Sequence, residues 1–282
     1  MRLENYTFVH NWILDHNASG ASHVAAHNQF SDWTEQEYRN ILGYNFTIDS
    51  ERGDIHVFEP SNSDSVNWVE AGAVTDVKDQ GDCGSCWAFS STGSLEGAHF
   101  IATGELLSFS EQQLVDCAGR RYDEDGCDGG VMEGSYLYWK SHKAELQSAY
   151  PYTSGNGKSG KCKYSKESKT SVEVSSFKKV TPSNPSQMKA AVAQQPISVS
   201  VDASWPLFMT YSKGVLDSKL CGKSLDHAVL AVGYGTEKGK DYWLVKNSWN
   251  TDWGENGYIK LAIRDGNGTC GVQMEPLFPT SN

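Results

Sequence analysis

The sequence predicts an α+β fold in which a helical half precedes a mostly antiparallel β half. Apolar residues recur at helical spacing after Cys86, and Gly104 can end that helix. After Pro182 the pattern changes to short β-rich runs separated by turn residues. A site that draws residues from both halves is therefore expected in the cleft between them.

The first 61 residues differ in composition from the rest of the chain. They contain no cysteine, hold five of the eight histidines, and set three arginines against nine acidic residues. The histidines are His10, His16, His23, His27 and His56. Apolar residues at helical spacing predict an amphipathic helix at the start, without the apolar core of a signal peptide. These residues are Tyr6, Val9, Trp12 and Ile13.

The elements that follow are predicted from local signals. Residues 47–64 are polar and lack hydrophobic periodicity, which predicts an exposed extended linker. We place a domain boundary near Asn62, a helical lobe at roughly 70–175 and a β lobe at roughly 176–282. Ser110 with Gln113 forms a capping box that opens a helix. The predicted strands lie within residues 196–203, 226–235, 241–249 and 257–263.

Composition and charge limit the class of protein. The 282 residues are 38% hydrophobic, which is ample for a packed core. No window approaches the roughly 18 consecutive apolar residues that a membrane span needs. The net charge of -11 argues against a nucleic-acid partner. We therefore expect neither a membrane nor a nucleic acid as partner.

Cys86 is the first candidate functional residue, because it stands where a helix is about to begin. A thiol in the first turn feels the positive end of the helix dipole, which favours the thiolate and makes Cys86 a candidate nucleophile. His227, within LDHAVLAVGYG, could act as its base, and Asn247, within YWLVKNSW, could orient the imidazole. Gln80 would donate to a developing oxyanion beside the Cys86 backbone N–H. We expect Cys86 to exist largely as a thiolate paired with the His227 imidazolium.

These motifs carry a resemblance to a known family. QGDCGSCWAFS, CDGG, LDHAV and KNSWNTDWGENGY arrive in the order and spacing of the papain-like cysteine proteases of the cathepsin L type, and CGSCW is that family's known signature around its cysteine. The resemblance covers nearly the whole chain. It implies a two-lobed papain-like fold, with a helical left lobe, a β right lobe and the active-site cleft between them. It also implies an endopeptidase that hydrolyses peptide bonds through an acyl-enzyme thioester.

The resemblance extends to the first 61 residues, which are similar to the rear part of an inhibitory propeptide. Matching residues are Arg2, Tyr6, Ile13, Asn17, Asn28, Phe30 and Asp32, whereas Val9 and Ala26 depart from the family's usual Asn and Gly. The chain is therefore expected to begin inside the propeptide and to be held as a zymogen. We expect acid to loosen residues 1–61, because their histidines gain charge near pH 6.

Cysteine usage fits an oxidising compartment with one thiol left over. Seven cysteines cannot all pair, and the residues alone do not choose between the many pairings of the other six. The resemblance implies the pairs Cys83–Cys127, Cys117–Cys162 and Cys221–Cys270, which leave Cys86 free. A redox role for CGSC is disfavoured because it needs no distant His and Asn. A zinc site is disfavoured because no second ligand pair is present, and we expect no metal and no cofactor.

Substrate recognition is expected beside CDGG. Gly129 and Gly130 leave the backbone open for antiparallel hydrogen bonding with an extended peptide or protein substrate. The resemblance implies a P2 pocket lined by Val131, Met132, Ser200 and Leu225, with Glu275 at its floor. It also implies that Asp226 takes part in substrate binding and that Trp249 shields the His227–Asn247 hydrogen bond. Such a pocket should favour Leu, Val or Phe and accept Arg through Glu275. The alternative is that Glu275 turns to solvent and the pocket stays apolar.

The remaining expectations concern function class and location. The Cys117–Cys127 stretch is too short for the occluding loop of cathepsin B, and no minichain like that of cathepsin H is seen, so endopeptidase activity is expected. A catalytically silent papain-fold binding or inhibitory protein is the alternative. The paired cysteines and the sequons point to a lysosome-like vacuole or the extracellular space. The sequons are at Asn5, Asn17, Asn45 and Asn267. The resemblance implies a monomer that cystatin-like inhibitors could bind.

Overall fold

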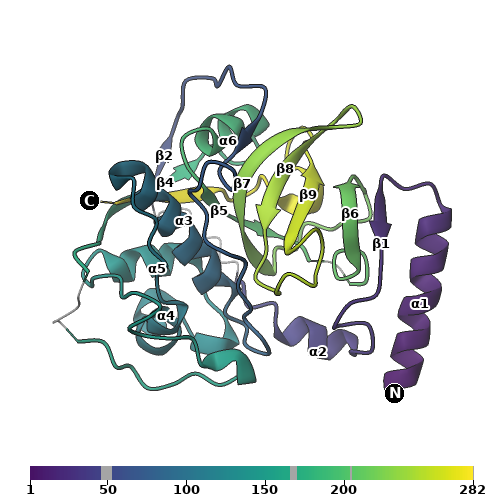
Figure 1. Cartoon of the computed structure of the whole chain (residues 1–282), viewed down its shortest axis with the longest axis horizontal. Coiled ribbons are helices and arrows are strands. Elements are labelled where there is room, and N and C mark those ends of the chain that lie inside the picture. Colours follow the sequence, from purple (N-terminus) through teal and green to yellow (C-terminus); the bar gives the residue numbers. More distant parts are fainter. Residues whose placement is uncertain (46–52, 166–169, 204, 282) are drawn as a thin grey trace.

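The computed structural model describes residues 1–45, 53–165, 170–203 and 205–281. The helices α3, α4 and α5 gather on one side of the molecule and a twisted sheet with α6 against it on the other, while α1 stands apart beyond β1 (Figure 1). The helices are α1 (Arg2–Ala18), α2 (Glu35–Asn40), α3 (Cys86–Thr103), α4 (Glu111–Cys117), α5 (Met132–Trp139) and α6 (Pro185–Val192). The predicted α+β class is confirmed.

The strands form one sheet whose two ends, β1 and β2, both come from the N-terminal region. Its order is β1-β6-β9-β8-β7-β5-β10-β4-β2, with β3 pairing β7 off this path. The strands are β1 (His23–Ala25), β2 (Asp54–His56), β3 (Val66–Asn67), β4 (Val174–Val180), β5 (Ile197–Val201), β6 (Tyr211–Leu216), β7 (His227–Glu237), β8 (Lys240–Lys246), β9 (Tyr258–Ala262) and β10 (Leu277–Ser281). The four predicted strands correspond to β5, β7, β8 and β9, and the pairs β5–β7, β7–β8 and β8–β9 are antiparallel as predicted.

The helix α3 is the central element of the helical lobe, and its start places Cys86 in the cleft. Nearly all of its residues are buried, and it packs against β7 and β10. The helix ends at Gly104, whose φ of 78° is the left-handed conformation that glycine adopts without strain, as the sequence predicted. Gly93 lets Leu230 approach closely, because a Cβ there would lie 2.8 Å from the leucine side chain.

The predicted capping box at the start of α4 is only half formed. The Ser110 hydroxyl accepts a hydrogen bond from the Gln113 backbone N–H at 3.0 Å. The Gln113 side chain does not return to the Ser110 backbone; its amide instead donates to the carbonyl of Lys143 and accepts from the N–H of Glu145. Tertiary partners therefore outcompete the local bond. A complete capping box lies at Thr34 and Glu37, where the sequence analysis had placed none.

The N-terminal segment, meaning the described part of residues 1–61, lies along the β lobe and crosses towards the helices. β1 pairs antiparallel with β6, and the Asn28 amide donates to the carbonyl of Met209 at 2.7 Å. The ring of Phe8 stacks on Trp205 at 4.9 Å between centroids. The segment is thus part of the same folded unit as the sheet.

The predicted linker is extended, but it is less free than expected. Its residues 47–52 lie outside the described residues. Beyond them, β2 pairs parallel with β4, and Gln187 of α6 bonds both the N–H and the carbonyl of Phe58. These contacts of β2 with β4 and of Phe58 with α6 could not be predicted, because β4 and α6 were not among the predicted elements.

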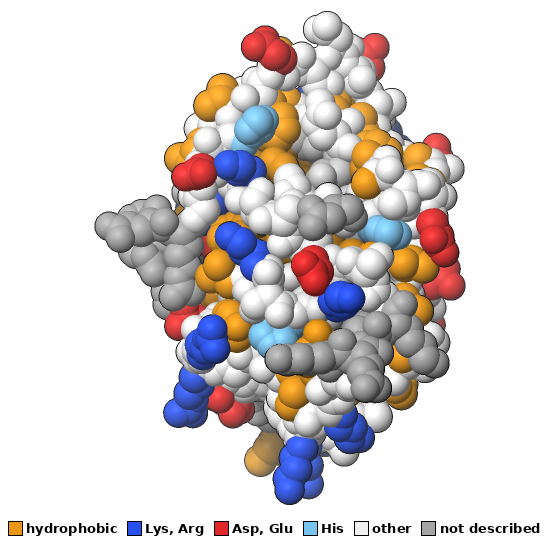
Figure 2. Space-filling view, turned by 90° about the vertical axis from the view of Figure 1, so that its left-hand side faces the viewer, with side chains coloured by type: hydrophobic (Ala, Val, Ile, Leu, Met, Phe, Trp, Pro, Cys, Tyr) orange, Lys and Arg blue, Asp and Glu red, His pale blue; other side chains and the backbone are white. Residues whose placement is uncertain are grey.

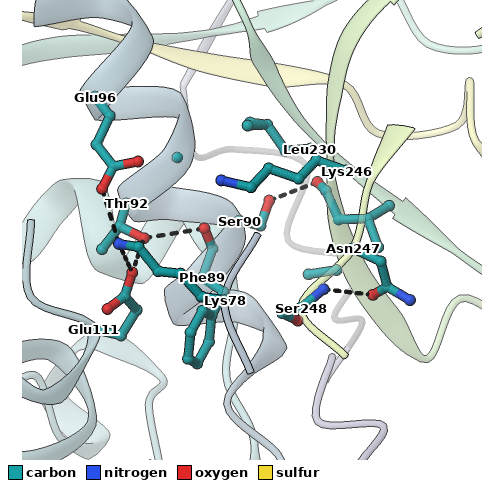
Figure 3. A pocket seen from close by; sticks show the side chains of 13 residues that line it. Lys78, Phe89, Ser90, Thr92, Glu96, Glu111, Leu230, Lys246, Asn247 and Ser248 are labelled. Atoms are coloured by element: carbon teal, nitrogen blue, oxygen red, sulfur yellow. Dashed lines mark hydrogen bonds and ion pairs between the residues drawn. The ribbon is translucent and has the colours of Figure 1, made fainter. Parts of the chain in front are cut away.

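A buried charge cluster ties the end of β8 to the helical lobe (Figure 3). The Lys78 ammonium lies 3.0 Å from Glu96 of α3 and 2.6 Å from Glu111 of α4. Lys246 donates to the carbonyl of Thr75 at 2.7 Å, and the Thr75 hydroxyl donates to Glu96. Breaking a buried pair of this kind typically costs about 3–5 kcal/mol. Both ion pairs lie within the helical lobe, and the Lys246–Thr75 hydrogen bond joins that lobe to the β lobe at the residue before Asn247.

The exposed face of the helical side has no single chemical character. In Figure 2 acidic and basic side chains are interspersed there, and apolar side chains are scattered among polar ones. Within the described residues, no helix combines the length and apolar character required to span a membrane.

Candidate active site

The candidate nucleophile lies at the bottom of the cleft between the lobes. Cys86 is the first residue of α3 and is 0% exposed. It is the free cysteine of the chain, because the structure pairs the other six as the resemblance implies. The disulfides are Cys83–Cys127, Cys117–Cys162 and Cys221–Cys270. The first of them joins the loop before Cys86 to the loop that carries Gly129 and Gly130.

The candidate base and its orienting residue come from adjacent positions of the β lobe. His227 begins β7 and Asn247 directly follows β8, and the imidazole Nε2 lies 2.7 Å from the Asn247 Oδ1. Since Oδ1 accepts, Nε2 carries the proton and Nδ1 keeps a lone pair in the neutral ring. Among the described residues Nδ1 has no hydrogen-bond partner. This nitrogen is therefore free to take a proton.

The indole of Trp249 covers this hydrogen bond. Its ring stacks on His227 at 4.6 Å between centroids and is 1% exposed. Phe208, Phe30 and Tyr38 surround the indole with edge-on contacts. Water is thereby kept from the His227–Asn247 pair, in the arrangement that the sequence analysis expected of Trp249.

Gln80 reaches the same site, but its amide is occupied. Its Nε2 donates to the carbonyl of Ile41 and to that of Cys83, both at 2.8 Å, while its Oε1 accepts from the Ser248 hydroxyl at 2.7 Å. Ile41 belongs to the N-terminal segment. The donor that would serve an oxyanion is thus bound to a carbonyl of the chain's own first 61 residues.

Residues Ile41–Asn45, named here the cleft segment, fill the cleft with backbone contacts. The Gly130 N–H donates to the Gly43 carbonyl at 2.9 Å, and the Asn45 N–H donates to the Gly130 carbonyl at 3.1 Å. The Tyr44 N–H donates to the carbonyl of Asp226 at 3.0 Å. The Tyr44–Gly130 bridge is parallel, whereas an antiparallel substrate was expected at Gly130. The cleft segment therefore runs opposite to the expected substrate direction.

Gly43 passes so close to the cysteine loop that no other residue fits. A Cβ on Gly43 would lie 1.8 Å from the carbonyl oxygen of Gly84. Both partners are backbone, so neither can move aside as a flexible side chain would. Sequence reasoning did not single out this glycine, and the signal that could have found it is weak, because a glycine just after a short helix is also an ordinary helix stop.

The side chain of Tyr44 occupies the pocket that the resemblance assigned to P2. Tyr44 is buried in one apolar cluster with Val131, Met132 and Leu225. Its hydroxyl donates to Glu275 Oε2 at 2.6 Å. Ser200 is fully buried, and Asp226 contributes its carbonyl to the Tyr44 backbone. Glu275 faces the pocket in this state and does not turn to solvent.

Burial sets the protonation states of the candidate pair. It raises the pKa of Cys86 to about 12, an effect partly offset by the backbone N–H groups of Ala228, Gly43 and Trp87. Burial also lowers the pKa of His227 to about 4, although the hydrogen bond to Asn247 works against it. Both groups are therefore neutral while the cleft segment is in place. The covered cleft removes the water that would solvate a thiolate and an imidazolium, so the charged pair is disfavoured in this state and stays a prediction for the uncovered site.

Two carboxyl groups in the cleft have raised pKa values. Burial raises the pKa of Glu275 to about 7, against the lowering effect of the Tyr44 hydroxyl. Burial likewise raises the pKa of Asp226 to about 6. No group of three or more potential metal ligands occurs in the described part of the chain. Cys86 and the lone pair of His227 Nδ1 are therefore the candidate nucleophile and the candidate base of this site.

Similar proteins are found for nearly the whole chain. A family model described as papain family cysteine protease matches residues 62–280. The chain is 44% identical over 276 residues to the probable cysteine protease RD21B of Arabidopsis thaliana, covering 95% of this chain and 58% of that protein. It is 44% identical over 270 residues to cathepsin L of Sarcophaga peregrina, covering 90% and 77%. The chain thus spans somewhat more than half of the Arabidopsis relative.

A solved structure of a proform resembles the whole chain. The proform of the ragweed pollen allergen Amb a 11, a cysteine protease, has a TM-score of 0.88 and 36% identity, covering 100% of this chain and 87% of that one. The match therefore includes the N-terminal segment as well as the two lobes.

Proposed function

Since the chain belongs to the papain family of cysteine proteases, we propose that it is a cysteine endopeptidase of the cathepsin L type, held as a zymogen by residues 1–61. The observation that carries this proposal is the joint placement of Cys86, His227 and Asn247 in a cleft that the N-terminal segment fills. The mature enzyme would begin near Asn62. Three disulfides support a compartment that is oxidising, such as a lysosome-like vacuole or the extracellular space.

The proposed reaction uses the lone pair on His227 Nδ1. Once the cleft segment leaves, Nδ1 takes the proton from Cys86 Sγ, and the thiolate attacks the carbonyl carbon of the scissile bond. The electron pair moves onto the carbonyl oxygen, where the Cys86 N–H and the Gln80 amide donate to it. His227 then gives its proton to the leaving amine as the C–N bond breaks. Water hydrolyses the remaining thioester, with His227 as base.

Inhibition in this proposal follows from the same contacts. The carbonyl of Ile41 occupies the Gln80 amide, Gly43 covers the cysteine loop, and Tyr44 fills the P2 pocket. A reversed chain direction at Gly130 keeps a peptide carbonyl from the position that Cys86 attacks. The cleft segment is thus bound with substrate-like contacts but is not aligned for cleavage.

The P2 pocket is proposed to prefer apolar residues and to accept arginine. Val131, Met132 and Leu225 offer apolar surface, whose burial favours Leu, Val or Phe by about 1.5–3 kcal/mol relative to an exposed side chain. Tyr44 shows that the space holds an aromatic ring with its polar tip against Glu275. A long cationic side chain would meet the same carboxylate when that group is charged.

Release of the N-terminal segment is proposed to need acid. Burial lowers the pKa of His16, His23 and His27, so each of them holds a proton less tightly in the bound segment than after release. Falling pH therefore favours the released state. The sequence analysis expected five histidines to respond to acid, and the proposal now rests on these three. They lie in α1 (His16), in β1 (His23) and just after β1 (His27).

The test of the proposed activity is the removal of the thiol. Cys86→Ala should leave the fold intact and lower the hydrolysis of a peptide blocked at both ends by at least about a thousandfold, because loss of a nucleophile leaves only binding and oxyanion contacts. Turnover is measured on acid-treated protein, with circular dichroism as the control for folding. Residual turnover within tenfold of the parent would contradict the assignment, and release of C-terminal dipeptides alone would contradict endopeptidase activity.

A further inference from the structure

Glu124 is a buried carboxyl group that the proposed reaction does not use. It lies in the loop between Cys117 and Cys127 and is 1% exposed. Its Oε2 accepts the Val131 backbone N–H at 3.1 Å, and the Ser135 hydroxyl lies 3.5 Å from its Oε1. Glu124 therefore contacts Val131, which directly follows Gly130. The sequence analysis did not assign Glu124 itself to the site.

The space for this carboxyl group exists because two neighbours are glycines. A Cβ on Gly130 would lie 1.7 Å from Glu124 Oε2, and a Cβ on Gly134 would lie 2.4 Å from Oε1. A side chain at either position would expel the carboxyl group from its place. Gly130 thus serves two purposes: its backbone faces the cleft, and its missing side chain admits Glu124 from behind.

The hydrogen bond from the Val131 N–H to Glu124 also supports the start of α5. Val131 is the N-cap residue of this helix, and its own side chain makes no capping hydrogen bond. Glu124 supplies an acceptor to the Val131 N–H from a different part of the chain. Hydrogen bonds to buried backbone groups of this kind are costly to lose, because the N–H is then left without a partner away from water.

The elements that Glu124 holds are those that would bind substrate. The N–H and the carbonyl of Gly130 both bond the backbone of the cleft segment, and Val131 and Met132 line the pocket that contains Tyr44. All three residues follow one another directly. Displacing the Val131 N–H by the loss of its acceptor would therefore move the backbone edge and the pocket wall together.

We propose that Glu124 is a positioning residue, which fixes the Gly130 backbone edge and the P2 wall from behind through its bond to the Val131 N–H. This inference rests on the proposed function, because it assigns Glu124 a share in peptide binding by that same site. Glu124 touches no reacting atom, so it acts on how substrate is held.

The charges around Glu124 indicate which substitution is closest to its native form. Burial raises its pKa, the Val131 N–H lowers it, and the acidic side chains of Glu133 and Asp123 raise it further. Glu133 is itself paired with Lys179 at 3.2 Å. A protonated carboxyl group has nearly the shape and the acceptor of a glutamine side chain, so Glu124→Gln keeps the bond to Val131.

The test compares variants of the full chain after acid processing. Glu124→Ala should raise KM for a blocked peptide with Phe at P2 by about tenfold, with kcat within about threefold, because only substrate positioning is lost. Glu124→Gln should stay within about threefold of the parent in both constants. Asp125→Ala is the matched control: it removes an exposed carboxylate of the same loop that pairs with Arg120.

A second measurement separates positioning from general damage. Alkylation of Cys86 by iodoacetamide needs the thiol and His227 but no bound peptide, so its rate in Glu124→Ala should match the parent within about threefold. If Glu124→Ala fails to fold, Glu124→Asp, which withdraws the carboxyl group by one methylene, should show the same selective rise in KM. An unchanged KM in the folded variant, or a parallel fall in alkylation, would overturn the inference. Loss of activity in the parent after alkylation tests the proposed function itself, independently of Glu124.

Discussion

The N-terminal segment is bound to the rest of the protein in two different ways. The cleft segment, Ile41–Asn45, contacts the catalytic groups mainly through backbone atoms and through the Tyr44 side chain. The anchor, defined here as α1, β1 and the turn to Asn28, is held by strand pairing, ring stacking and buried histidine. From this difference we propose that the cleft segment blocks the site, whereas the anchor sets the pH at which the block is released.

Geometry makes the cleft segment the part most sensitive to added volume. Gly43→Ala would place a methyl group against the Gly84 carbonyl, and since neither backbone can yield, the segment must leave its position. We expect unprocessed protein at pH 7 to gain about a hundredfold in hydrolysis of a P2-Leu peptide, because overpacking of this kind costs about 1–3 kcal/mol or more. Activity is measured with processing monitored by gel electrophoresis.

The matched control adds the same methyl group in the anchor. Gly20→Ala meets no atom within 4 Å, although its φ of 76° carries some backbone strain. It should leave the cleft closed at pH 7. Equal activation by both variants would show that the cleft segment has no special role, and no activation by Gly43→Ala would remove the steric argument.

The anchor should respond to pH through His23. Burial and the neighbouring His16 lower the pKa of His23 from 6.5 to about 4 in the bound state. A lowered pKa means that the released state binds the proton more tightly. The anchor's contribution is therefore complete above about pH 6.5 and is lost as pH falls from there towards 4, by at most about 3 kcal/mol.

Replacing His23 should change the pH at which the N-terminal segment is released. His23→Gln should shift the pH midpoint of self-processing downwards by about half a unit or more, because the proton uptake on release is lost. His56→Gln, on the exposed strand β2, is the control and should leave the midpoint in place. A midpoint that stays where it was in His23→Gln would assign pH control to the carboxyl groups and not to the anchor.

The smallest expected effect concerns the pocket that Tyr44 vacates. Burial under Tyr44 raises the pKa of Glu275 to about 7, and the vacated pocket loses part of that burial, so the carboxylate should lose its charge at a lower pH, as pH falls through the pKa of the open pocket. Hydrolysis of a P2-Arg peptide should therefore decline relative to P2-Leu between pH 7 and pH 4, by up to about tenfold. Glu275→Ala should remove this dependence, and parallel profiles with full arginine acceptance in that variant would refute the pocket role.

The sequence predicted those parts of the fold that local pattern determines. The spacing after Cys86 and the stop at Gly104 predicted α3, and short β-rich runs separated by turn residues predicted β5, β7, β8 and β9. It did not predict β4 or α6, and it overstated the capping box at Ser110, because Gln113 finds tertiary partners. Local sequence propensity carries no information about hydrogen-bond partners that are far away in the sequence.

The candidate site likewise has a part that local pattern predicts and a part that depends on long-range contacts. Cys86, His227, Asn247 and Gln80 could be chosen from motif and spacing, and the structure brings them together. The contacts that Gly43 and Tyr44 make in the cleft could not be predicted from the sequence, because they depend on how residues far apart in sequence approach each other. The burial that disfavours charge on the cysteine and the histidine could not be predicted for the same reason, since it arises from the covering of the cleft.

Titration of Cys86 with an epoxide that alkylates activated cysteine thiols tests most directly whether the N-terminal segment closes a competent active site. The full chain at pH 7 should take up almost no label, because the thiol is buried and neutral, and acid-treated protein should take up one equivalent at Cys86 with parallel loss of activity. Cys86→Ala should take up none in either state. Rapid labelling of the untreated chain, or no labelling after release of the N-terminal segment, would contradict the proposed zymogen.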